Sequence, residues 1–278
     1  MKNILKIMLM MITIFTIAGS AVYAAEIPVS DQDQLITSND WTEISNLQDE
    51  MNKEEPDATI DYDKALKVYV DCNLIKLQTA DTKKLTSALE SANYVWVIPF
   101  KMEKTYGMFT VAKGLPLREE AKSVLTKAEQ EEVKNHAGKW MITEIAEHTV
   151  EPYYDILLEK REALSDCTRV VLVGSQPGMR QPVALGMDDE TARIWISLGY
   201  QYPVMEKIPE TQNVESGVYS FDSVAEISDT YIEDSEVSTG VGVQSRSSMK
   251  YVAGIGIIVI GSILILSVLK KKKLEDYE

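Results

Sequence analysis

The sequence predicts an α+β fold, in which a mixed or antiparallel sheet carries about three helices. Short segments alternate apolar and polar residues as half-buried strands do, and longer segments between them repeat apolar residues at helical spacing. Over residues 65–146 the order is strand, helix, strand, strand, helix, strand, which is the ferredoxin-like βαββαβ order. A helix and three strands (αβββ) continue this pattern to about residue 202, and an uncharged run near the carboxyl terminus adds a transmembrane helix.

The first half of the domain begins with a strand, in which Leu66, Val68 and Val70 alternate with more polar residues. Asp81 can then cap a helix that ends near Asn93. A hairpin of two strands, a helix closed by a glycine and a last strand complete this half, over Tyr94–Phe100, Tyr106–Val111, Leu117–Ala137 and Trp140–Ala146.

In the second half, Pro152 is well placed to start a helix, and three strands follow over Thr168–Val173, Val183–Met187 and Ala192–Leu198. The two halves therefore share an order of strand, helix and antiparallel strands. An internal duplication is one explanation, although no residue-level identity relates the halves. A single mixed sheet that the second half continues is the other explanation. We favour the single sheet, with six or seven strands and three helices.

The amino terminus has the organisation of a signal peptide over residues 1–24. Lys2 and Lys6 form a positive region, Ile7–Ile17 is apolar, and Val22–Ala24 resembles a cleavage site with small residues. We predict cleavage at the end of this segment. The alternative is an uncleaved second anchor, but the apolar stretch is short for a full membrane span.

Near the carboxyl terminus, Tyr251–Leu269 is a run of 19 residues without a charge, and Lys270–Lys273 follow it. A bilayer core about 30 Å thick needs about 20 apolar residues as a helix, so this run predicts a transmembrane helix with the lipid bilayer as its partner. Cationic flanks stay in the cytoplasm. The sequence thus predicts a single-pass protein of the cell membrane, with residues 270–278 as a cytoplasmic tail and the domain outside.

Two polar segments flank the predicted domain, which covers residues 63–202. Residues 25–62 form a polar leader that we expect to pack loosely on the domain, with a short helix capped by Asp40. Residues 203–250 are acidic and rich in small polar residues, which predicts a flexible stalk. Within this stalk, the apolar residues of 218–224 can dock back onto the domain.

The charge of the exported part is strongly negative. Of the 28 basic residues, two precede residue 26 and four follow residue 250, which leaves 22 basic against 40 acidic residues between them, a net charge of −18. Such a surface repels nucleic acid and anionic lipid headgroups, so neither is expected as the main ligand. Cationic partners and metal ions remain open, and solubility alone also explains the charge.

Cys72 and Cys167 are the two cysteines of the chain. An exported domain permits disulfides, so one bridge between them is possible. Its loop would restrict the unfolded chain by about 4 to 5 kcal/mol in the entropy model. Two separate buried thiols that act as small apolar side chains are the alternative.

The sequence assigns no catalytic residue, no metal site and no cofactor. The nearest set for zinc is Glu144, Glu147 and His148, but the His-Glu-x-x-His motif is absent, and in a strand the two glutamates lie on opposite faces. Ser175 lacks the Gly-x-Ser-x-Gly elbow, so its segment is interpreted as a loop between two strands. Asp188–Glu190 is interpreted as a hairpin turn.

Weak candidates for ligand binding lie on this loop and on the last strand. Gln176, Met179 and Arg180 offer donors and a flexible apolar group on a loop between two strands. On the last strand Arg193 and Trp195 share the face opposite Ile194, Ile196 and Leu198. They form a contact patch if that face is exposed, and Trp195 is a core residue if a helix covers it.

These observations lead to three hypotheses. The first is a non-enzymatic extracytoplasmic domain that binds an unknown ligand or protein and is held at the cell surface by a single-pass anchor. The second is a membrane-tethered hydrolase that acts on envelope material, for which two acids should converge in a cleft with raised pKa values. The third is an accessory subunit of a membrane assembly. We favour the first, because the sequence offers no catalytic motif.

Overall fold

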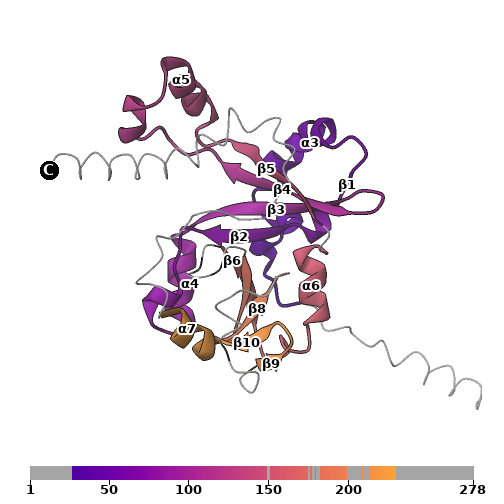
Figure 1. The fold of residues 1–278 in the computed structure, drawn as a ribbon, viewed down its shortest axis with the longest axis vertical. Helices are drawn as coiled ribbons and strands as arrows, with labels where there is room; N and C mark the ends of the chain where they lie inside the picture. Colours follow the sequence, from indigo (N-terminus) through magenta and orange to yellow (C-terminus); the bar gives the residue numbers. More distant parts are fainter. Residues whose placement is uncertain are drawn as a thin grey trace, which may run out of the picture.

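A computed structural model describes residues 27–148, 151–174, 176, 179, 182–198, 208 and 213–229. These residues form one mixed sheet of ten strands with helices on both faces (Figure 1). The predicted α+β class is therefore confirmed. The helices of the described residues are α2 (Trp41–Ile44), α3 (Gln48–Glu54), α4 (Thr82–Glu90), α5 (Lys127–His136), α6 (Tyr153–Glu159) and α7 (Phe221–Asp229).

Nine strands follow one another across the sheet, and their order is β5 (Trp140–His148), β4 (Tyr106–Lys113), β3 (Asn93–Lys101), β2 (Leu66–Val70), β6 (Arg169–Val173), β7 (Val183–Met187), β8 (Ala192–Ser197), β10 (Val218–Ser220) and β9 (Asn213–Glu215). A short β1 (Thr59–Ile60) pairs with the end of β3. All neighbours are antiparallel except β2 and β6, which run parallel with Tyr69 opposite Val173. The central parallel pair joins the two halves into the single mixed sheet that we favoured.

The ferredoxin-like arrangement is wrong, although the first half has the predicted order of elements along the chain. A split β-α-β unit needs another strand between the two that a helix connects. Here β2 and β3 lie side by side and antiparallel, with Val70 opposite Asn93. The connection that contains α4 thus starts and ends at the same end of the sheet, so α4 makes no crossover. All seven predicted strands are present, and β1, β9 and β10 were not predicted.

The predicted helix over residues 117–137 is shorter than expected. Thr126 and Glu129 form a capping box, in which the Thr126 N–H donates to Glu129 Oε2 over 2.7 Å and the Glu129 N–H donates to Thr126 Oγ1 over 3.3 Å. This box starts α5 at Lys127. The helix ends at His136, close before Gly138, whose φ of +77° suits a glycine after a helix.

Alternating side chains of the sheet build a core on each face. Val171, Leu185 and Trp195 belong to the cluster beneath α4 and α7. Their neighbours Leu172 and Ala184 belong to the cluster on the opposite face, where α6 packs (Figure 1). A third cluster, around Trp96, Phe100 and Phe109, lies over β3 and β4. Both faces are therefore covered, as the apolar character of the central strands requires.

The segment before residue 63 is part of the folded unit and does not pack loosely. Leu35, Ile44 and Met51 are fully buried in the third cluster. The helix expected after Asp40 is present as α2 and α3 with a short 3-10 turn, η3 (Ser45–Leu47), between them. Asp40 makes no side-chain cap to it, because its carboxylate binds two aromatic side chains of β3 instead.

The stalk boundary predicted at residue 203 is too early. Residues 213–229 form β9, β10 and α7, and the apolar residues of 218–224 dock on the domain as expected. Val218, Tyr219, Phe221 and Val224 are buried. Their burial continues the sheet by two strands and adds a helix over its face.

The predicted signal peptide, transmembrane helix and cytoplasmic tail lie outside the described residues. Within the part of the chain that the structure describes, no helix has the length and apolar character needed to cross a membrane.

Candidate functional site

The loop residues that were candidates for ligand binding are buried. Gln176 is 2% exposed, and its side chain accepts from the Leu74 N–H over 3.0 Å and donates to the Cys72 carbonyl oxygen over 2.7 Å. Met179 is buried in the cluster beneath α4 and α7. Arg180 lies outside the described residues. Gln176 and Met179 therefore have structural roles, and neither presents its side chain to a ligand at the surface.

The second candidate pair is divided between core and surface. Trp195 is fully buried and stacks on Phe221, with 5.7 Å between the ring centroids and 11° between the planes. It is a core residue, as we expected for the case in which a helix covers this face, and that helix is α7. Arg193 is exposed, and its Nε donates to Asp188 Oδ2 over 2.6 Å.

Asp188 organises the turn between β7 and β8, as the sequence predicted for this acidic triplet. Its Oδ1 accepts from the backbone N–H groups of Thr191 over 2.6 Å and Glu190 over 2.8 Å. These two bonds, followed by the pairing with Arg193, hold the pKa of Asp188 below its usual value. Arg193 therefore supports a turn.

The two cysteines are free thiols in this structure. Cys72 packs against the cluster beneath α4 and α7, whereas Cys167 is buried in the cluster on the opposite face of the sheet. The disulfide proposed from the sequence is therefore not formed, and the alternative of two separate thiols describes the structure. Burial, as the main cause, raises the pKa of each thiol to about 11, which makes both poor nucleophiles.

A groove of about 320 Å³ lies between two segments that are far apart in the sequence. One wall is Ile75, the first residue of the 3-10 turn η5 (Ile75–Leu77), with the residues that follow the turn, Gln78, Thr79 and Ala80. The other wall is the first turns of α7. We call this feature the η5–α7 groove.

The η5 wall is fixed on both sides. Gln176 holds the backbone of residues 72–74 just before it, as described above. After it, Ala80 accepts a hydrogen bond of 2.6 Å from the Ala192 N–H, and the Thr82 N–H donates to the Glu190 carbonyl over 3.0 Å. The turn that Asp188 organises therefore also anchors this wall.

The α7 wall is fixed by its helix start and by the core beneath it. The Ser223 N–H donates to Ser220 Oγ over 3.2 Å, which satisfies a backbone donor at the beginning of the helix. Phe221 is 3% exposed and rests on Trp195. Gln176 thus fixes the backbone that leads into one wall and Trp195 supports the other, so the shape of the groove is preformed.

The lining of the groove has an apolar floor and an acidic rim. Ile75 and Phe221 are buried, and Ala80 and Ala225 are half-buried. Asp222 and Glu226 are exposed and lie one helical turn apart on α7. Sequence reasoning missed them because the segment resembles a stalk; the signal that could have found them is the helical spacing of Phe221, Val224 and Ala225 beside the two acids.

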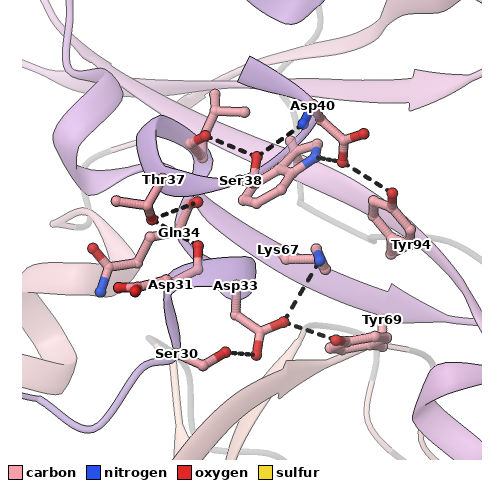
Figure 2. A network of polar contacts seen from close by, with 12 residues as sticks. Ser30, Asp31, Asp33, Gln34, Thr37, Ser38, Asp40, Lys67, Tyr69 and Tyr94 are labelled. Atoms are coloured by element: carbon pink, nitrogen blue, oxygen red, sulfur yellow. Dashed lines mark hydrogen bonds and ion pairs between the residues drawn. The ribbon is translucent and has the colours of Figure 1, made fainter. Parts of the chain in front are cut away.

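A second polar arrangement lies buried between the amino-terminal segment and the sheet, and Figure 2 shows most of it. We define the Asp33 cluster as Ser30, Asp33, Lys67, Tyr69 and Arg169. Asp33 is 2% exposed and accepts hydrogen bonds from Ser30 Oγ over 2.6 Å, Tyr69 Oη over 2.7 Å and Arg169 Nη2 over 3.0 Å. A buried carboxylate with three donors is fully engaged in the structure.

Lys67 completes this cluster. Its Nζ is 3.7 Å from Asp33 Oδ1 and lies over the rings of Tyr94, at 4.6 Å, and Trp96, at 5.2 Å. Burial lowers the pKa of this lysine, and the nearby Asp33 and Asp40 oppose the shift. Asp40 itself accepts from Tyr94 Oη over 2.9 Å and from Trp96 Nε1 over 3.0 Å.

Two acids and two bases therefore meet under the amino-terminal segment: Asp33, Asp40, Lys67 and Arg169. Their charges balance, and each acid reaches from that segment to strands of the sheet. This arrangement holds residues 27–40 against the sheet. We interpret it as structural, because its carboxylates are occupied by donors of the protein itself.

Among the described carboxyl groups, Glu144 on β5 has the largest rise in pKa. Burial raises its pKa to about 7, while a hydrogen bond with Thr110 opposes this shift. It lies near Tyr153 of α6, on the face opposite the η5–α7 groove. Among the described residues, no three His, Cys, Asp or Glu side chains are placed to hold a metal ion.

Comparisons of the chain with protein-family models, with curated proteins and with solved structures find no match. The sites are therefore interpreted from their own geometry.

Proposed function

We propose that this chain is a single-pass surface protein of the cell membrane, which displays a non-enzymatic extracytoplasmic domain that binds a ligand or a partner protein. The observation that carries the binding role is the η5–α7 groove. Its walls are fixed, its floor is apolar and its rim is polar, which is the usual composition of a binding site.

The chemistry of the groove favours binding over catalysis. Its described lining contains no histidine, cysteine or lysine. A glycoside hydrolase needs two carboxyl groups that face each other across a cleft. Asp222 and Glu226 instead share one wall, on the same helix and one turn apart. The carboxyl with the raised pKa, Glu144, lies on the other face of the sheet, so the hydrolase alternative has less support.

The membrane part of the proposal rests on the sequence. The run Tyr251–Leu269 and the lysines after it provide a stop-transfer signal, and residues 1–24 provide the export signal. After α7, 21 residues separate Asp229 from Tyr251, and most of these are polar residues or glycine. They are the remaining spacer between domain and bilayer.

Cell fractionation tests this proposal. A tagged full chain and a matched truncation that ends at residue 250 would be expressed in the same exporting host. We expect the full chain to sediment with membranes, to resist a high-salt wash and to be released by detergent, and the truncation to be released from the cell envelope as a soluble protein. A full chain that is soluble without detergent would contradict the anchor.

A further inference from the structure

The size of the η5–α7 groove limits what it can hold. About 320 Å³ is near the lower end of small-molecule sites, which range over about 300 to 1,000 Å³. Its rim residues Gln78, Asp222 and Glu226 are all exposed. A groove of this size can hold a single long side chain but not a whole dinucleotide cofactor.

The charges that line the groove favour a positively charged side chain. Asp222 and Glu226 contribute two carboxylates, and no basic residue is among the described lining. The domain around them is itself strongly acidic. An ammonium or guanidinium group would be attracted by the whole surface and would find two acceptors one helical turn apart.

The floor of the groove fits the stem of such a side chain. Lysine and arginine carry their charge on an aliphatic chain, which packs on apolar surface while the charged end stays at the rim. The half-buried Ala80 and Ala225 supply such surface, and Ile75 and Phe221 lie buried beneath it. Leu77 precedes the lining residue Gln78 in the chain and is 43% exposed, so it offers an apolar contact outside the groove for a neighbouring residue of a bound peptide.

We propose that the η5–α7 groove binds a lysine or arginine side chain that is presented by a peptide segment of a partner protein. This inference rests on the proposed function and names the ligand class of the same site. A peptide is favoured over a free amine because the groove is open to solvent, so the residues that flank the bound side chain can add contacts outside it, for example with Leu77.

The test uses the full chain in mild detergent at low ionic strength and a probe peptide with fluorescein on its amino terminus, fluoresceinyl-Gly-Leu-Arg-Leu-Gly-amide. Its matched control replaces arginine by the neutral isostere citrulline. We expect saturable binding by fluorescence anisotropy, and an affinity about tenfold lower for the citrulline peptide, since two exposed charge pairs are lost.

Three variants locate the binding. Asp222→Asn/Glu226→Gln removes the rim charges and should weaken the arginine peptide by about tenfold. Asp49→Asn/Glu50→Gln removes the same charge from two exposed residues of α3, and less than a roughly twofold effect is expected there. Ala225→Lys places a competing cation on the floor and should abolish binding, which keeps the test sharp if the double variant is unstable.

Three results would overturn the inference: no saturable binding of the arginine peptide, an equal loss in the α3 variant, or displacement of the peptide by an equal concentration of spermidine. The first result would show that the domain binds no arginine peptide. The second would show that binding depends on the overall negative charge and not on the groove. The third would show that the groove binds free amines as well as it binds peptides. None of them changes the result of fractionation, so a failure here is distinguishable from a failure of the proposed function.

Discussion

At the scale of single residues, two carboxyl groups of this domain are held in opposite ways. Asp33 is buried with donors and opposite charges around it. Glu144 is half-buried with only the Thr110 hydrogen bond to favour its charged form, and partial burial raises its pKa. Each group leads to its own prediction.

We predict that Asp33→Asn lowers the free energy of unfolding by about 3 to 5 kcal/mol, because it leaves Lys67 and Arg169 without their buried counter-charge. Lys67→Met should cost less, since methionine still packs among the aromatic rings and Arg169 still compensates Asp33. The double variant should lower the free energy of unfolding by less than the sum of the two single effects, with a coupling energy of about 1 to 3 kcal/mol.

Urea unfolding of the four proteins measures this cycle. Lys122→Met is the matched control, because Lys122 forms an exposed pair with Glu119 and its loss should cost less than about 1 kcal/mol. Additive effects of the two substitutions in the Asp33 cluster would show that the cluster does not act as a unit.

Glu144 should make stability depend on pH. Its folded pKa of about 7 lies above its ordinary value of 4.5, so the folded protein keeps the proton longer than the unfolded chain. The free energy of unfolding should therefore fall as pH rises from about 4.5 to about 7 and level off above that. Glu144→Gln keeps the side chain neutral and should raise stability by about 1 to 3 kcal/mol at pH 8, with little effect at pH 4.

Thermal or urea unfolding at several pH values checks this prediction, with exposed Glu90→Gln as the control. An equal effect of Glu144→Gln at pH 4 and pH 8 would contradict the assigned cause, because only a titrating group gives a difference.

At the scale of elements, α7 and η5 connect the core to the groove. The apolar side of α7 covers Trp195, and its exposed side carries the acids of the rim. One helix thus closes one face of the sheet and forms a wall of the candidate site. Loss of the packing of α7 should therefore affect both the stability of the core and the shape of the groove.

We predict that Phe221→Ala lowers the free energy of unfolding by about 3 to 5 kcal/mol, since it removes a 3%-exposed aromatic ring that stacks on Trp195. Glu226→Gln, one turn along the same helix, should change stability by less than about 0.5 kcal/mol. If urea unfolding gives similar values for both, α7 is not part of the cooperative unit.

The elements differ in how far the sequence predicts them. The seven strands with clear alternation or apolar runs were found, and so was the Asp81 cap, whose Oδ1 accepts from the Lys83 and Lys84 N–H groups. β9 and β10 have three residues each, too few for a period, and lie in an acidic segment. Gln176 looked exposed because its hydrogen-bond partners, at residues 72 and 74, are brought to it only by the parallel pairing of β2 and β6.

At the scale of the whole molecule, the sheet is continuous because β2 and β6 pair in parallel at its centre. The two flanking segments that composition alone marks as polar both contribute to the folded unit, one through the Asp33 cluster and the other through α7. Their polarity comes from the sides that face solvent, whereas a few apolar residues at the right spacing fix them to the core. Pair contacts of that kind are outside what local sequence patterns predict.

We propose that a single span holds this domain outside the cell membrane. Labelling intact cells with a membrane-impermeant maleimide tests it directly, using Glu90→Cys on the exposed side of α4 and Lys272→Cys in the tail, with the unsubstituted chain and its two high-pKa native thiols as background. We predict that the cysteine at position 90 is labelled in intact cells and that the one at position 272 is labelled only after permeabilisation. Labelling at position 272 but not at position 90 in intact cells would contradict the account.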